Sequence, residues 1–350
     1  MHISFPFTMP ALVLAFFLVF TLSGCDKQEK TVLKLQGQTM GTSWSAIVVP
    51  ADDSALQTDV LQPELETALK TVNDQMSTWQ KDSELSEFNR QQTLDWFPVS
   101  KDLAAVAMEA QKVSELSEGI YDTSVGPLVN LWGFGAGKSG EQKIPGAEDI
   151  AAAMKNVGYQ KLEVRLDPPA LRKKVEGLYI DLSSIAKGYG VDQLAAVLNK
   201  AGAGDYMVEI GGEIHTKGQS PRGDDWRIAV EKPVALDRMV QQGLLLKQGG
   251  LATSGDYRNY FTADGRRYSH TFDPRTGEPV KHSLASVSVL AENTMLADAY
   301  ATMLMAMGEV KGKAFALEKG IEAYFIWRTD DSFDTFATDG FKAVLVSAED

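Results

Sequence analysis

The sequence predicts an α+β protein in which mainly antiparallel sheets are flanked by helices. Two kinds of segment predict it: long stretches with apolar residues at helical spacing, and short apolar or alternating stretches bounded by turn residues. The short stretches cluster instead of alternating strictly with the helices, which argues against a doubly wound parallel sheet. The 350 residues are enough for one large domain or two closely joined lobes.

In the first half of the chain, residues 31–50 alternate and pause at Met40 and Gly41, which predicts two strand segments around a bend. A helix is predicted next by four apolar residues at steps of four, three and four: Leu65, Leu69, Val72 and Met76. Ser100 is a suitable N-cap for the following helix, and Gly119 ends it.

The remaining elements follow from the same spacing rules. Further helices are predicted over 150–157, 185–201, 294–307 and 309–319. Strands are predicted over 161–166, 174–180, 206–210, 213–217, 226–231, 240–246, 284–290, 322–328 and 342–346.

Residues 1–24 have the pattern of a bacterial lipoprotein signal peptide. Residues 11–22 form an apolar run that is short for a membrane span but typical of a signal-peptide core. The lipobox pattern Leu-Ser-Gly-Cys then ends at Cys25, whose thiol would carry the lipid after cleavage. We therefore expect residues 25–30 to be a polar tether and residues 31–350 to form the functional domain.

Composition and the residue after the cysteine indicate the compartment and exclude one class of partner. Asp26 resembles the signal that retains lipoproteins in the inner membrane, so we expect the protein there, facing the periplasm. Cys25 is the only cysteine, so the folded domain has no internal disulfide. A net charge of -13 argues against non-specific nucleic-acid binding, which requires a basic face.

One motif is misleading. Residues 135–140 match the dinucleotide-binding pattern G-x-G-x-x-G. That fingerprint requires a strand before it and a helix after it. Neither is indicated here, so we interpret this segment as a flexible glycine-rich loop.

Residues 269–277 place a histidine, a carboxylate, an arginine and a Pro/Gly turn on one loop. His270 in this loop could act as a general base or bind phosphate, although a lone histidine is often structural. Asp298 and Thr302 stand four apart and hence on one helix face, where a carboxylate and a hydroxyl suit Mg²⁺. Alternatively, Asp298 only favours the dipole of a helix N-terminus and Thr302 only packs.

Two further segments are candidates for ligand contact. Residues 181–188 lead into a helix start, where exposed amides and Lys187 would bind an anion. The alternative there is an ordinary N-cap by Ser183 or Ser184. The glycine pair 211–212 permits either close approach of a ligand or a β-bulge.

Together these segments resemble the ApbE-type flavin transferases, the FAD:protein FMN transferases. The matching segments occur in the family's order: 39–42, 77–79, 121–128, 181–188, 211–213, 254–258, 269–277 and 297–299. The resemblance implies that FAD binds with Mg²⁺ and that a Thr or Ser hydroxyl of an acceptor protein attacks the flavin-side phosphorus. AMP leaves, and FMN stays attached through a phosphodiester. The acceptors implied are subunits of membrane redox pumps, such as sodium-translocating NADH:quinone reductases.

The resemblance also implies roles for single residues. Contacts to FAD are implied for Met40, Trp79, Ile120, Tyr121, Asp122, Asp181, Lys187, Arg258 and Phe272. Ligands of Mg²⁺ are implied at Asp298, Thr302 and Ser184, the last through its backbone carbonyl. The candidate catalytic residues are His270, Asp298 and Lys187, and the base for the attacking hydroxyl is either His270 or Asp298.

Two other functions stay open from the sequence. One is a lipoprotein that binds a flavin and keeps it for redox chemistry. The other is a periplasmic pyrophosphatase that hydrolyses free FAD.

Overall fold

The computed structural model describes residues 32–51, 56–135, 142–234, 239–257, 259–330 and 332–346. Every strand pair among these residues is antiparallel, and helices accompany the sheets, so the predicted α+β class is confirmed. The predicted signal peptide, the tether and Cys25 lie outside the described residues, as does nearly all of the predicted loop 135–140. Within the described chain, no helix combines the length and hydropathy that a membrane crossing requires.

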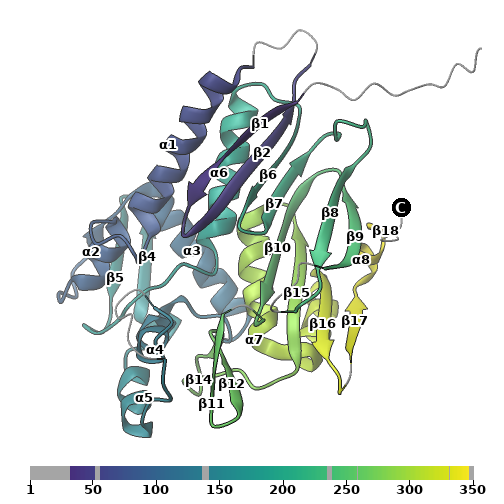
Figure 1. Ribbon diagram of the computed structural model, residues 1–350. Helices are drawn as coiled ribbons and strands as arrows, with labels where there is room; N and C mark the ends of the chain where they lie inside the picture. Colours follow the sequence, from purple (N-terminus) through teal and green to yellow (C-terminus); the bar gives the residue numbers. More distant parts are fainter. Residues whose placement is uncertain are drawn as a thin grey trace, which may run out of the picture.

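The largest sheet has eight strands in the order β1-β2-β6-β7-β10-β15-β16-β17 (Figure 1). Their bounds are Leu33–Thr39, Thr42–Val49, Asp205–Ile210, Glu213–Lys217, Gly249–Gly255, Leu284–Ala291, Glu322–Arg328 and Phe333–Ala337. A second sheet contains β18 (Leu345–Val346), β9 (Val240–Leu246) and β8 (Trp226–Glu231), and a third contains β3 (Phe97–Pro98), β5 (Pro169–Lys173) and β4 (Leu162–Leu166). Two small hairpins pair β11 (Tyr260–Ala263) with β12 (Arg266–Ser269), and β13 (Phe272–Asp273) with β14 (Glu278–Pro279).

The described helices are α1 (Thr58–Met76), α2 (Glu84–Arg90), α3 (Lys101–Leu116), α4 (Gly126–Leu131), α5 (Ala147–Met154), α6 (Ala186–Lys200), α7 (Thr294–Lys319) and α8 (Asp339–Lys342), with 3₁₀ turns at Thr123–Val125 and Tyr159–Lys161. Of these, α1, α6 and α7 cover one face of the large sheet (Figure 1). Buried apolar residues of β1, β2 and β6 form one core with α1 and α6. On the opposite face, Leu251 and Ile326 pack against Ile228 and Leu244 of the second sheet, so the large sheet lies between two layers.

Helix α7 is interrupted at the position that the two separate helix predictions indicated. Gly308 has φ 77 and ψ 174, which breaks the helical path between the predicted helices 294–307 and 309–319. Only a glycine adopts this conformation at little cost. The kink changes the direction of α7 at this residue.

Two strand predictions are wrong in whole or in part. Residues 174–180 are turn and irregular backbone, and the partner of β4 is instead β5, before this segment. The predicted strand 342–346 begins within α8, and only its last two residues pair, as β18. In both places the apolar residues serve a core contact that does not require an extended strand.

The central strand β10 lies outside any predicted element, since its sequence GGLATSG is rich in small residues. The structure explains this composition. A Cβ on Gly250 would lie 2.5 Å from the backbone nitrogen of Thr294, so β10 passes directly beneath the start of α7. The close approach of α7 requires small residues in β10, and these residues have low β-propensity.

Candidate active site

A cavity of about 430 Å³ opens where the start of α6, the middle of α7, the end of β10 and the 269–274 loop meet. It collects eleven of the residues implied by sequence: Trp79, Ile120, Tyr121, Asp122, Asp181, Ser184, Lys187, His270, Phe272, Asp298 and Thr302. These residues come from five separate segments, so only the fold brings them together.

Two implied residues are not placed in this cavity. Met40 lies in the turn between β1 and β2 and lines a neighbouring hollow with Thr39 and Asn73. A Cβ added to Gly190 of α6 would lie 3.0 Å from the methyl carbon of Met40. Met40 therefore packs beneath the site instead of lining it. Arg258 lies outside the described residues.

Asp298 is fixed by close contact between α6 and α7. Its Oδ2 accepts a hydrogen bond of 3.0 Å from the backbone N–H of Gly188, and the residue is 3% exposed. A Cβ at Gly188 would overlap the carbonyl oxygen of Thr294 and lie 2.8 Å from Cβ of Asp298. Asp192 ties the same helices together by accepting from the N–H groups of Thr294 and Met295, each at 2.9 Å. Asp298 is therefore held in place. The negative charge at the N-terminus of α7, which was the alternative role for Asp298, is supplied by Asp192.

The floor of the cavity carries more buried negative charge than positive. Lys187 forms an ion pair with Glu213, which is 2% exposed. Burial raises the pKa of Glu213 to about 7, although Lys187 counteracts it, and burial also raises the pKa of Asp298. Burial opposes the charge of Lys187, but the attraction of both carboxylates outweighs it and raises the pKa of the ammonium group. Two carboxylates share one cation, so the site has room for further positive charge.

Glu213 was not among the residues implied by sequence. The signal was present in the glycine pair before it, which forms a turn and no β-bulge. Gly211 and Gly212, with φ 60 and 106, make the two-residue turn between β6 and β7. Glu213 begins the second strand, and its Oε2 has no hydrogen-bond partner among the described residues.

The segment before α6 leaves its helix start uncapped. The N-cap position is Ile185, which makes no side-chain cap bond, so the alternative of capping by Ser183 or Ser184 is wrong. The Ser183 side chain donates to Asp181 at 2.5 Å, and that of Ser184 donates to the Tyr121 hydroxyl at 2.9 Å. The first amides of α6 are nevertheless engaged, because the N–H of Ala186 donates to the carbonyl of Leu182 at 2.8 Å and that of Gly188 donates to Asp298.

The loop that carries Asp181 and Ser184 is anchored from behind. Asn89 donates to the carbonyl of Ile180 and accepts from its N–H, both at 2.8 Å. The buried ammonium of Lys173 donates in turn to the carbonyls of Asn89 and Gln91, at 2.8 and 2.9 Å. These contacts fix the position of the loop relative to the cavity.

Asp122 has a structural role in addition to lining the cavity. Its Oδ1 accepts from the N–H and hydroxyl of Ser124, at 2.7 and 2.6 Å, and its Oδ2 accepts from the N–H of Tyr159 at 2.8 Å. Both oxygens are therefore committed to shaping the backbone. Burial nevertheless raises the pKa of this carboxyl.

His270 is oriented for proton transfer. Its Nδ1 lies 3.0 Å from the carbonyl oxygen of Asn259, which can only accept, so Nδ1 carries the proton and Nε2 is the basic nitrogen. Burial lowers the pKa of the ring, which favours the neutral form. The ring of Phe134 lies 6.3 Å away and supplies an apolar neighbour.

Of the aromatic residues implied to contact FAD, Trp79 and Tyr121 differ in exposure. Tyr121 is 2% exposed and belongs to the core, whereas Trp79 is 70% exposed at the cavity rim. An indole so exposed beside a cavity offers a free face for stacking on a flat ring. Because Tyr121 is buried, its main contact at the site is the hydrogen bond between its hydroxyl and that of Ser184.

Oxygen donors of the kind implied for a metal also line the cavity. Thr302 shares a hydrogen bond of 3.2 Å with Ser254 of β10, one helical turn from Asp298. Among the described residues, no three His, Cys, Asp or Glu side chains gather in a cluster that could hold an ion. A complete protein cage is not what Mg²⁺ needs, because it commonly takes one or two carboxylates and fills its sphere with water and phosphate.

Comparisons with known proteins agree over nearly the whole chain. The sequence profile of the ApbE family matches residues 40–325. The FAD:protein FMN transferase of Vibrio cholerae is 44% identical over 324 residues, covering 93% of this chain and 96% of that protein. That of Haemophilus influenzae is 41% identical over 341 residues, covering 96% and 98% respectively.

Solved structures give the same result. The flavin transferase ApbE from Vibrio cholerae has a TM-score of 0.83 at 43% identity, covering 90% of this chain and 99% of that one. The apo flavinyl transferase ApbE of Pseudomonas stutzeri has a TM-score of 0.82 at 38% identity, covering 90% and 96%. By sequence and by fold, this chain belongs to the ApbE family of flavin transferases.

Proposed function

We propose that this enzyme transfers FMN from FAD to a Thr or Ser hydroxyl of an acceptor protein, in a reaction that requires Mg²⁺ and releases AMP. The observation that carries the proposal is the single cavity that joins an oriented histidine, a half-buried lysine and a fixed carboxylate. The relatives' shared name, FAD:protein FMN transferase, supports the same substrate.

The proposed step is a substitution at phosphorus. The acceptor oxygen bonds to the flavin-side phosphorus while the bond from that phosphorus to the bridging oxygen breaks. AMP leaves with the bridging oxygen, and the hydroxyl proton passes to Nε2 of His270. Lys187 would hold the diphosphate and offset its charge.

The residues of the cavity fit a magnesium ion. Asp298, Thr302 and the carbonyl of Ser184 would hold it, and the shortage of positive charge around Asp298 and Glu213 favours a cation. The bound ion would supply Lewis-acid stabilisation of charge on the diphosphate.

We also propose that the enzyme is an inner-membrane lipoprotein that faces the periplasm, anchored through Cys25. The lipobox pattern and Asp26 support this placement. A tether there would keep the enzyme beside membrane redox complexes, and subunits of sodium-translocating NADH:quinone reductases or related complexes are the proposed acceptors.

The test is incubation of the enzyme with FAD, Mg²⁺ and a purified candidate acceptor. Flavin fluorescence on the acceptor after denaturing electrophoresis, with an equal amount of AMP, is the expected result. Free FMN and AMP without labelled acceptor would instead identify a pyrophosphatase. Flavin that stays on the enzyme and bleaches with a reductant, without AMP, would identify a redox flavoprotein.

A further inference from the structure

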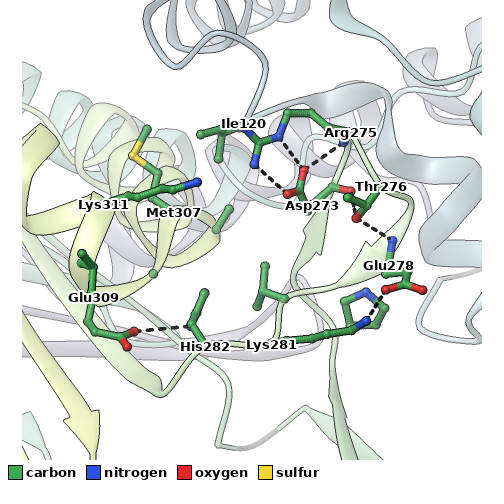
Figure 2. A pocket seen from close by; sticks show the side chains of 15 residues that line it. Ile120, Asp273, Arg275, Thr276, Glu278, Lys281, His282, Met307, Glu309 and Lys311 are labelled. Carbon is green, nitrogen blue, oxygen red and sulfur yellow. Dashed lines mark hydrogen bonds and ion pairs between the residues drawn. The ribbon is translucent and has the colours of Figure 1, made fainter.

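A second hollow, of about 470 Å³, adjoins the catalytic cavity (Figure 2). Ile120 and Ala306 line both, so the two are separated only by the thickness of these side chains. The other walls of the hollow are the turn between β13 and β14 with the residues after it, and the kinked part of α7 around Gly308.

Helix α7 runs from the catalytic cavity to this hollow. Asp298 and Thr302 line the cavity, Ala306 lines both spaces, and Val310 lines the hollow. Asp298, Thr302 and Ala306 are spaced by four, so they follow one stripe along the first part of α7, and Val310 lies just beyond the break at Gly308.

The opposite wall is also continuous. Along β13 and its turn, Phe272 and Pro274 line the catalytic cavity, while Asp273 and Arg275 line the hollow. The same two elements therefore build both spaces. A polymer chain lying in the hollow would have its next residues at the catalytic cavity.

The charges in the hollow cancel. Figure 2 shows Arg275 paired with Asp273 and Lys281 paired with Glu278, and the remaining pair of opposite charges is Lys311 and Glu309. The hollow therefore suits a ligand with little net charge.

The hollow also contains apolar surface. Val280 and Met307 line it, and Val310 at its edge is 73% exposed. Apolar surface between balanced charge pairs is typical of sites that bind a polypeptide.

We propose that this hollow binds the acceptor protein, through the polypeptide segment that flanks the modified hydroxyl. The proposal rests on the proposed flavin transfer. It assigns FAD to the catalytic cavity and the acceptor chain to segment 306–310 and the facing turn.

The test compares Val310→Asp with Leu317→Asp in the full enzyme. Leu317 lies on the same helix, is 60% exposed and is outside both spaces, so it is a matched control. The probe is the soluble domain of the flavinylated subunit of a sodium-translocating NADH:quinone reductase. Three quantities are measured for each variant: binding of the probe by biolayer interferometry, KM for the probe, and affinity for FAD by fluorescence.

We expect Val310→Asp to weaken probe binding and raise KM for the probe by about tenfold or more, while kcat and FAD affinity match the control. Equal KM and equal probe binding in the two variants would overturn the proposal. A selective loss of FAD affinity would overturn it as well, by placing the nucleotide in the hollow. If the unmodified enzyme binds the probe but transfers no flavin to it, the proposed function fails while docking stands; absence of any binding overturns the docking site.

Discussion

Asp298 is the residue on which the proposed metal chemistry depends. It is buried and held by the N–H of Gly188. We predict that Asp298→Asn lowers flavin transfer on the order of 10²–10³-fold, because the amide keeps the acceptor oxygen for Gly188 but loses the negative charge that attracts Mg²⁺. Transfer assays over a range of Mg²⁺ concentrations check this.

The matched control for that prediction is Asp339→Asn. Asp339 is a carboxylate whose side chain is 98% exposed, far from the cavity in the fold, and its substitution should leave transfer unchanged. Unimpaired Asp298→Asn with the same Mg²⁺ requirement would place the metal elsewhere.

Lys173 is a buried cation whose ammonium group donates to backbone carbonyls. It is 2% exposed, and burial lowers its pKa from the ordinary value of 10.5 to about 8. Between pH 8 and 10.5 the unfolded chain therefore binds more protons at this residue than the folded chain does. By linkage, the contribution of Lys173 to stability rises with pH across this window.

We predict that the stability of the wild type relative to Lys173→Met increases by about 2 kcal/mol between pH 7.5 and pH 10. Urea unfolding at both pH values measures it. The exposed Lys70→Met is the matched control, since its side chain is 73% exposed. If the difference in unfolding free energy between the wild type and Lys173→Met does not change with pH, Lys173 has the same pKa in the folded and the unfolded chain.

Some candidate residues could be found from local sequence. Asp298, Thr302, Lys187 and His270 stand out by type and spacing, the resemblance implies their roles, and the fold places all four in one cavity. Glu213 was missed because its importance comes from burial beside Lys187, which lies 26 positions away in sequence. Desolvation and charge pairing of that kind depend on tertiary contacts.

At the scale of elements, the crossing of α6 and α7 decides the geometry of the site. Gly188 permits that crossing, because a side chain there would overlap the carbonyl of Thr294. We predict that Gly188→Ala destabilises the protein by about 1–3 kcal/mol and also lowers transfer, since it displaces Asp298. Thermal unfolding and the transfer assay measure the two effects.

Gly204→Ala provides the comparison for that substitution. A Cβ at Gly204 would meet no atom within 4 Å, so this variant should keep both stability and activity. Equal behaviour of the two alanine variants would mean that the helices can separate at no cost.

The elements predicted well are those with a strong period. The helices α1, α3, α6 and the two parts of α7 each repeat apolar residues on one face, and the hairpin of β1 and β2 has an alternating pattern around a turn. The central strand β10 escaped prediction because small residues adapt it to α7. Segment 174–180 was predicted as a strand because its composition is compatible with one, but it lacks a partner strand in the fold.

At the scale of the whole molecule, the proposed anchor separates location from catalysis. All residues of the cavity lie between Trp79 and Ala306, far along the chain from Cys25. We predict that Cys25→Ser moves the enzyme from the membrane to the soluble fraction while it still transfers flavin. Fractionation, palmitate labelling and the transfer assay on both forms check this.

Two outcomes would contradict that prediction. A Cys25→Ser protein that stays lipid-labelled and membrane-bound would exclude this cysteine as the anchor. A soluble, folded but inactive protein would show that the tether also takes part in catalysis.

The sequence by itself determined the α+β class, the helix faces and the chemical types of most candidate site residues, because local spacing and residue type are encoded over a few positions. Tertiary structure alone decided the common cavity, the pairing of Lys187 with Glu213, the position of Met40 beneath the site and the hollow beyond Ala306. Each of these arises where segments distant in sequence exclude water from one another, and burial of that kind sets both the contacts and the pKa values of the groups involved.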